Sequence, residues 1–319
     1  MVVNCPYLKG GVTPPPPPPP PEPPLPPGPA PFDLQKAIDA CPSGGTVLVP
    51  FGVITVPGPV QLKSGITIKG AGVGQTVLDC PGYRDGGAVM GTPTGVANVT
   101  ISDMTMRSEK PEQHCFGIWV AKYSNLVIER VRMEGCYYAL KADTQGANLT
   151  LRDFTARNCA QVYISRLTKG RFYNVDIEAV TRRLNGTMHA LYLEGGSSDL
   201  EFYNTRAVGG SGWTVQLYQE TSGTSGVLFD GLTVQGMVPV FVGAGFSGVT
   251  MRNVTAIATT TGDPVFWMPS STNVTVDTFT AAGGSQLVTA TGAGVVFRNG
   301  TYKGTRLGTG ATFENVRLT

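Results

Sequence analysis

Aromatic and polar side chains recur through the middle of the sequence at intervals of 22 to 29 residues. Each lies in a short run of alternating residues, in which apolar neighbours such as Ile118 and Val120, or Leu191 and Leu193, would point to the opposite face. The outward row predicted in this way is Trp119, Lys141, Tyr163, Tyr192, Gln216, Phe241 and Phe266. Flat rings in a row suit the faces of sugars, so the row predicts a polysaccharide groove. Exposed aromatic residues are equally typical of a protein interface, and both interpretations stay open.

Charged and hydroxyl side chains accompany this row. Two residues after members of the row lie Asp143, Ser165, Glu194 and Tyr218, with Arg166 and Glu220 nearby. Carboxylates and cations beside rings suit the hydroxyl and acid groups of a glycan. The candidate substrate-binding residues are therefore Trp119, Lys141, Tyr163, Arg166, Tyr192, Gln216, Tyr218 and Phe241.

Cleavage of a glycan would need specific pairs of these groups. Glycoside hydrolysis requires two carboxylates roughly 5 to 9.5 Å apart. Glu194 and Glu220 would lie one coil apart and Asp143 two coils from Glu194, so these three are the candidate catalytic residues. Surface carboxylates are more often only solvated, and binding is favoured over cleavage.

A polysaccharide lyase would instead need a base, often with a calcium ion. Lys141, Arg166 and His189 are candidate bases, but the sequence contains no tight acidic cluster for calcium. His114 and His189 are expected at turns or strand edges, too far apart to share a metal. No CxxC pair is present. We therefore predict no metal and no cofactor.

The elements that position these residues repeat along the chain. Short alternating strands recur at spacings of 16 to 30 residues around the apolar anchors Ile101, Ile128, Leu151, Phe172, Phe202, Phe229, Met251, Val276, Phe297 and Phe313. A drifting period of this length predicts a solenoid, and the absence of a regular leucine pattern favours a parallel β-helix.

Two further columns support this prediction. Two residues after the anchors come Asp103, Arg130, Asp153, Asn174, Asn204, Gly231, Asn253, Thr278, Asn299 and Asn315. Most of these are turn-forming residues, whose side chains can hydrogen-bond along a stack. Cys115, Cys136 and Cys159 are spaced by 21 and 23 residues and predict a buried ladder of free thiols.

The first part of the chain has a different character. Residues 14–31 are mostly proline and predict an extended rod of roughly 55 Å between an N-terminal attachment segment, residues 1–13, and a β-helix over residues 32–319. Asp33 is a good N-cap, and one helical face carries Leu34, Ala37, Ile38 and Cys41, which predicts a short amphipathic helix.

The segment AIDACPSGGTVLVPFGVITVPGPVQLKSGITIKGAG, Ala37–Gly72, resembles the start of pectate-lyase-like right-handed β-helix proteins. The resemblance implies an all-β, right-handed parallel β-helix of about ten or more coils, closed at its N-terminal end by the short helix. It implies little about function, because this fold hosts lyases, hydrolases, epimerases, adhesins and phage tailspikes.

Composition excludes some functions. The net charge of +2 gives no electrostatic reason to bind nucleic acid. No apolar run approaches the length of a transmembrane helix, so no membrane insertion is expected. The start of the sequence lacks a basic segment followed by an apolar stretch, so we expect no signal peptide and synthesis in a reducing cytoplasm.

A proline rod before a rigid β-helix, and a C-terminal strand without a cap, resemble the plan of phage tailspikes and minor tail proteins. We therefore expect a homotrimeric virion tail protein that binds other tail proteins through residues 1–31 and a host surface glycan through its body. The alternatives are an extracellular polysaccharide lyase or glycoside hydrolase, and a non-phage adhesin or wall protein.

Overall fold

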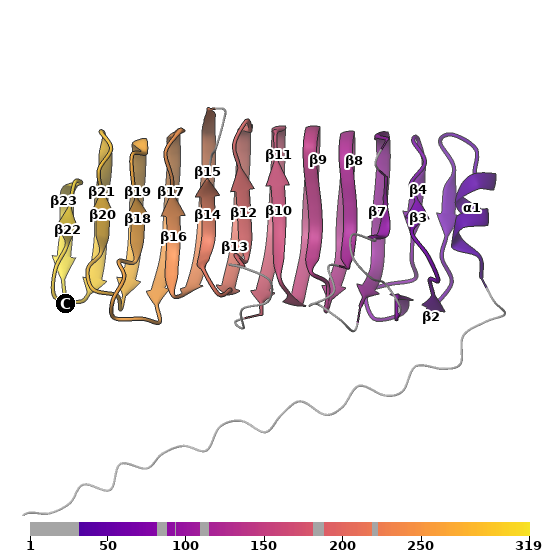
Figure 1. Ribbon diagram of the computed structural model, residues 1–319, viewed down its shortest axis with the longest axis horizontal. Coiled ribbons are helices and arrows are strands. Elements are labelled where there is room, and N and C mark those ends of the chain that lie inside the picture. Colours follow the sequence, from indigo (N-terminus) through magenta and orange to yellow (C-terminus); the bar gives the residue numbers. More distant parts are fainter. Residues whose placement is uncertain (1–31, 82–87, 93, 109–114, 181–187, 219–222) are drawn as a thin grey trace, which may run out of the picture.

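Within each strand, residues point alternately inward and outward, and the strands stack into a single solenoid. The computed structural model describes residues 32–81, 88–92, 94–108, 115–180, 188–218 and 223–319. These residues form a right-handed parallel β-helix of about ten turns, as predicted, with strands stacked along one axis (Figure 1). The predicted attachment segment and proline rod, residues 1–31, lie outside the described residues.

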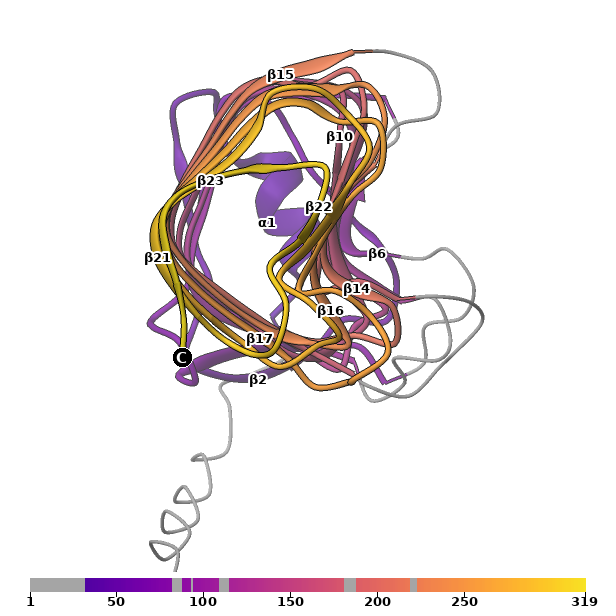
Figure 2. The same cartoon turned by 90° about the vertical axis from the view of Figure 1, so that its left-hand side faces the viewer.

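The short helix α1 (Leu34–Ala40) covers the N-terminal end of the solenoid. The side chain of Asp33 accepts a hydrogen bond of 2.9 Å from the backbone N–H of Lys36, which confirms the predicted N-cap. Leu34 and Ile38 are buried against the first coil. Seen along the solenoid, α1 lies within the outline of the coils (Figure 2), where it covers strand edges that would otherwise be open to pairing.

One face of the solenoid carries the outward row and is called the row face. Its strands pair in parallel in the order β3 (Val60–Gln61), β6 (Ala88–Thr92), β8 (Phe116–Glu134), β9 (Tyr138–Cys159), β10 (Gln161–Ser165), β12 (Leu191–Glu194), β14 (Trp213–Tyr218), β16 (Val238–Val242), β18 (Phe266–Met268), β20 (Val288–Ala290) and β22 (Gly308–Thr309).

The remaining strands complete each coil. They are β1 (Thr46–Leu48), β2 (Gly52–Thr55), β4 (Thr67–Lys69), β5 (Thr76–Asp79), β7 (Val96–Arg107), β11 (Leu167–Ala179), β13 (Ser198–Gly209), β15 (Thr224–Gly236), β17 (Phe246–Ala258), β19 (Thr272–Ala282), β21 (Val295–Lys303) and β23 (Thr312–Leu318). The longest strands, β8 and β9, run from the row face around a corner of the coil, so one strand carries residues of two faces.

The interior is filled by columns of apolar side chains. All ten predicted anchors lie in one hydrogen-bonded register, from Ile101 opposite Ile128 to Phe297 opposite Phe313. Within this column the rings of Phe172, Phe202 and Phe229 stack, with centroids 4.0 Å and 4.5 Å apart. Burying each such ring stabilises the fold by roughly 2 kcal/mol, so the column is a principal source of cohesion between coils.

The predicted turn column forms the bend that follows the anchors. All of its residues have a positive φ, between 50° and 59° for the nine that are not glycine. Asparagine and aspartate tolerate this left-handed conformation better than most residues, which explains their recurrence. Side-chain hydrogen bonds link successive coils, as from Asn174 Nδ2 to Asp153 Oδ1 at 2.7 Å. The Asn and Asp residues of this column therefore act as turn formers, as predicted.

The predicted thiol ladder also lies in the interior. Cys115, Cys136 and Cys159 are buried and free, as is Cys80 one coil earlier. Burial, with a smaller contribution from neighbouring Cys115, raises the pKa of the Cys80 thiol to about 12. These cysteines therefore behave as small apolar residues of the core.

Candidate functional site

The outward row is continuous across the row face. Trp119, Lys141, Tyr163, Tyr192, Gln216 and Phe241 lie opposite one another on successive coils, in that order. Their predicted apolar neighbours, including Ile118, Val162, Leu193 and Val215, are fully buried, so the predicted alternation is confirmed up to this point.

The last member of the predicted row is wrong. Phe266 lies opposite Val240, is fully buried and packs in the interior against Phe297. The outward position opposite Phe241 belongs to Trp267. A shift of one residue moves every side chain of a strand to the other face, and the run Phe266-Trp267 offers an aromatic residue in either register.

The rings of the row face cover one another more than predicted. They form an unbroken series of ring contacts through Trp119, Phe116, Tyr138, Tyr163, Tyr192, His189, Trp213, Phe241 and Trp267, which we call the aromatic series. Gln216 is only 4% exposed and Phe241 only 5%, which corrects the prediction that both are outward and exposed. The ring of Trp213 stacks on that of Phe241, with centroids 4.2 Å apart, and the ring of Trp267 contacts Phe241 edge-on, with centroids 5.8 Å apart. These larger rings cover this part of the row.

At one end of the row a lysine and a carboxylate are held among rings. The Lys141 ammonium lies 3.1 Å from Asp143 Oδ2, and the Trp119 indole N–H donates to Asp143 Oδ1 at 3.1 Å. The same ammonium lies 5.2 Å from the Phe116 ring centroid and 5.6 Å from that of Trp119. These contacts fix both charges on the row face, where cation–π attraction adds to the ion pair.

Further along, Tyr163 and Glu194 are joined. The Tyr163 hydroxyl donates a hydrogen bond to Glu194 Oε2 on the neighbouring coil. Asp143 lies two coils from Glu194, as predicted, because Lys141 pairs with Tyr163 and Tyr163 with Tyr192. Two coils correspond to roughly 10 Å of backbone separation, close to the widest spacing of an inverting carboxylate pair.

The remaining predicted residues lie at the margins of the row face or beyond the described ranges. Glu220, the proposed partner of Glu194, and His114 both lie outside the described residues. Tyr218 ends β14 opposite Glu194, and its ring centroid lies 6.4 Å from that of Phe241. Arg166 follows β10 and is exposed at the turn beside the row face.

His189, expected as a turn or edge residue, belongs to the aromatic series. Its ring stacks on that of Trp213, with centroids 5.6 Å apart, and its Nδ1 lies 2.8 Å from the Trp213 carbonyl oxygen. Burial lowers the pKa of His189 to about 4, so the ring is neutral at pH 7. Because a carbonyl only accepts, Nδ1 carries the proton and Nε2 is the acceptor.

The sequence prediction missed Phe116, Tyr138, Trp213 and Trp267. The first three precede the alternating part of their strands, where a coil turns onto the row face and alternation gives no direction. Burial raises the pKa of the Tyr138 hydroxyl to about 12, with Tyr137, Asp143 and Glu194 acting in the same direction, so it stays a donor. Phe116, Tyr138 and Trp213 each come shortly before a member of the row, and this recurrence was the signal available in the sequence.

In the described part of the chain, neither a cluster of metal ligands nor a membrane-spanning helix is found. In the described ranges no three His, Cys, Asp or Glu side chains gather as a metal site would require. No helix among these residues has the length and apolar character needed to cross a bilayer.

Similarity to known proteins is found in structure and not in sequence. No protein-family model matches the sequence, and no curated protein matches it. Among solved structures, the A-module of a mannuronan C-5 epimerase from Azotobacter vinelandii has a TM-score of 0.66 and 19% identity, over 90% of each chain. The polygalacturonase of Erwinia carotovora has a TM-score of 0.57 and 13% identity, over 89% of each chain.

A viral protein has the same fold. The ORF18 protein of Geobacillus virus E2 has a TM-score of 0.52 and 14% identity, over 88% of this chain and 57% of the viral one. At these identities the likeness concerns the fold alone. The chain is similar to pectate-lyase-like β-helix proteins, including a phage protein, and its architecture is that of a right-handed parallel β-helix.

Proposed function

We propose that this protein binds a polysaccharide along the row face. The observation that carries the proposal is the aromatic series, which extends without a break from Trp119 to Trp267. Six rings of the series are half-buried and offer apolar surfaces to sugar faces: Trp119, Tyr138, Tyr163, Tyr192, Trp213 and Trp267. Lys141, Asp143 and Glu194 offer hydrogen-bonding groups among them. The epimerase and the polygalacturonase of similar fold are polysaccharide-active enzymes by their names, which supports the same class of ligand.

The charges favour a glycan over a subunit as the occupant of this face. The core of a protein interface is depleted in charged residues. Here Lys141 lies over the rings of Phe116 and Trp119, and Tyr163 and Trp119 each donate to a carboxylate. Such preorganised polar groups match hydroxyl-rich ligands, which need donors and acceptors as well as apolar faces.

The test is the replacement of Trp119, Tyr163 and Tyr192 by alanine together. We expect the triple variant to lose binding to the envelope polysaccharides of the host, measured by calorimetry or affinity electrophoresis. The matched control replaces Phe51, Tyr173 and Tyr203, which are aromatic residues away from the row face. The rings of Tyr173 and Tyr203 stack on each other, with centroids 5.4 Å apart. Equal binding by both variants would overturn the proposal, and a triple variant that becomes monomeric would show that the row is a subunit interface.

We further propose that the protein is part of a phage tail, as a homotrimer that attaches to other tail proteins through residues 1–31. The fold shared with a protein of Geobacillus virus E2 supports this role. Light scattering of the purified protein tests the trimer, for which a mass near three times 33.6 kDa is expected. A mass near 33.6 kDa would contradict the trimer and leave the glycan proposal standing.

The second candidate is a polysaccharide lyase or glycoside hydrolase with the same face as its site. The placement of Asp143 and Glu194 two coils apart on one face favours it. A hydrolase would release reducing ends from a bound glycan, and a lyase would produce an unsaturated sugar that absorbs ultraviolet light. Glu194→Gln should abolish hydrolysis, and absence of both products with the wild-type protein on a glycan that it binds would exclude this candidate.

A further inference from the structure

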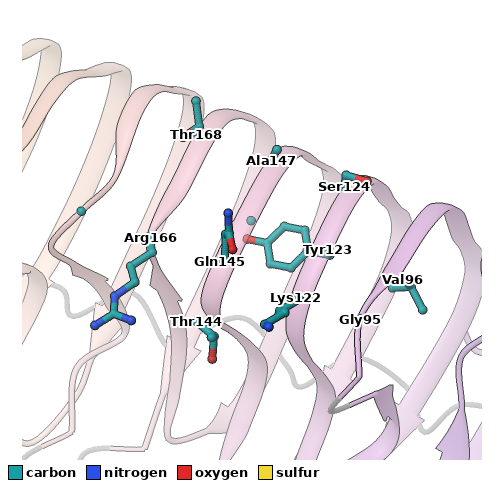
Figure 3. A pocket seen from close by; sticks show the side chains of 12 residues that line it. Gly95, Val96, Lys122, Tyr123, Ser124, Thr144, Gln145, Ala147, Arg166 and Thr168 are labelled. Atoms are coloured by element: carbon teal, nitrogen blue, oxygen red, sulfur yellow. The ribbon is translucent and has the colours of Figure 1, made fainter.

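A groove lies at the turn where the row face meets the next face of the solenoid. It has a volume of about 790 Å³ and is lined by backbone and side chains of neighbouring coils. Lys122 comes from β8, Thr144 and Gln145 come from β9, and Arg166 follows β10 (Figure 3). We call this hollow the turn groove.

The turn groove is cationic. Lys122 and Arg166 are exposed, and within the described residues neither forms an ion pair. Lys122 pairs in register with Gln145, and Gly146, the next residue, donates to the Arg166 carbonyl at 3.0 Å. The two cations therefore lie two coils apart, roughly 10 Å along the solenoid, with Gln145 between them.

The neighbouring acid does not neutralise these cations. Asp143 already holds the Lys141 ammonium at 3.1 Å and the Trp119 indole at 3.1 Å. The Asp143 carboxylate is therefore bound to groups of the row face, whereas Lys122 and Arg166 line the turn groove.

The floor of the turn groove contains an unused hydroxyl. Tyr123 is 5% exposed, and its hydroxyl has no hydrogen-bond partner among the described residues. A Cβ on Gly146 would collide with the ring and hydroxyl of Tyr123, so only glycine leaves room for this side chain. Burial raises the pKa of Tyr123, so the hydroxyl keeps its proton and stays a donor.

The backbone of the turn groove bends at two of its lining residues. Thr144 has a φ of 74° and Arg166 a φ of 50°. The same left-handed conformation occurs at Arg130 and Thr278 of the turn column, so it marks a bend of the coil.

The turn groove combines the cations of Lys122 and Arg166, the hydroxyl of Tyr123 and the side-chain amide of Gln145. From these groups we infer that it binds an acid group of an anionic glycan whose sugar rings lie on the row face. The inference rests on the proposed function and adds a preference for charged polymers. The acid group is a carboxylate of a uronic acid or a phosphodiester, since Lys and Arg bind both through charge-assisted hydrogen bonds. Arg166 is the residue that connects the two surfaces, because it follows β10 of the row face directly.

The experiment compares three soluble probes: polygalacturonate, the same polymer with its carboxyl groups reduced, and a teichoic-acid polymer linked by phosphodiesters. The wild-type protein is compared with the double variant Lys122→Gln, Arg166→Gln. The control is Lys303→Gln, Arg317→Gln, which removes the same charge from exposed positions elsewhere. Calorimetry at low and high salt gives the affinity, and raised salt should weaken binding of the acidic probes.

The expected result is that the wild-type protein binds one acidic probe about tenfold more tightly than the reduced polymer, and that the double variant loses this preference while the control keeps it. The probe that is preferred distinguishes a carboxylate from a phosphodiester. Equal binding of charged and reduced polymers, or an unchanged preference in the double variant, would overturn the inference alone. Failure to bind any of these probes and the host glycan would overturn the proposed function as well.

Discussion

The hydroxyl of Tyr163 donates a hydrogen bond to Glu194 across two neighbouring coils of the row face. The two residues belong to strands β10 and β12, which pair in parallel, so this contact is fixed by the stacking of the coils rather than by a loop. It joins an aromatic ring and a carboxylate that a glycan would meet together.

We expect Tyr163→Phe to weaken glycan binding by about three- to tenfold, because the ring stays while the hydroxyl that orients Glu194 is lost. The melting temperature should change little, since Tyr163 lies on the outside of its coil and is half-buried. Calorimetric titration with a polysaccharide that the wild-type protein binds measures the first effect, and thermal unfolding measures the second. Unchanged affinity would show that the hydrogen bond does not position the carboxylate for the ligand.

Adjacent substitutions in β18 should have opposite effects. Phe266 is fully buried, so Phe266→Ala should cost about 3–5 kcal/mol of folding free energy. Trp267 is on the outer face, so Trp267→Ala should cost less stability and should reduce glycan binding. Denaturant unfolding and glycan titration of the two variants check both expectations. The reverse pattern would mean that the register of β18 is shifted by one residue.

The turn column predicts a substitution at an exposed position that is nonetheless destabilising. Asn174 has a φ of 52°, donates to Asp153 and accepts from Asn204 at 3.3 Å. Asn174→Ala should cost about 1–2 kcal/mol, because alanine disfavours this φ and breaks both hydrogen bonds. Asn174→Gly keeps the conformation and should cost less. Thermal unfolding that ranks glycine below alanine would contradict the backbone argument.

Stability should fall in mildly acidic solution because of His189. Burial lowers the pKa of His189 from its ordinary value of 6.5 to about 4 in the folded protein, so the unfolded chain binds the proton first as pH falls. Folding therefore loses stability from about pH 6.5 down to about pH 4, by roughly 3 kcal/mol in total, and no further below that range. The free energy of unfolding should fall more between pH 7.5 and pH 5 for the wild-type protein than for His189→Gln. A parallel response would place the titration elsewhere.

The interior thiols should be unreactive in the folded protein. Cys80, Cys115, Cys136 and Cys159 are buried, and burial raises the pKa of Cys80 and Cys115. An alkylating reagent followed by peptide mapping should leave these four unmodified at pH 8 and modify all of them in denaturant. Rapid modification of any one in the native state would show that its coil opens locally.

The solenoid was predictable because each coil repeats the same physical requirement. An apolar residue must fill the interior at every anchor, and a residue tolerant of positive φ must follow two positions later. Both requirements survive variation in turn length, so Ile101 and Phe313 could be assigned to one column from their local patterns alone.

The site was less predictable for two physical reasons. Phe266 and Trp267 are consecutive aromatic residues, and only the register with Phe241 decides which one points outward. Phe116, Tyr138 and Trp213 begin strands β8, β9 and β14, before the alternating part of each strand, so alternation gives no direction for their side chains. Exposure also depends on neighbours from other coils, which is why Phe241 is covered by Trp213 and Trp267.

The outward residues of the row face and the interior anchors are subject to different kinds of selection. The strands of the row face are held together by the interior columns, so a substitution at Tyr192 or Lys141 would change the outer surface while the anchors are left intact. Such a face can change its specificity one coil at a time. A lineage that must follow a changing glycan could therefore diversify its binding surface without first having to rebuild its fold.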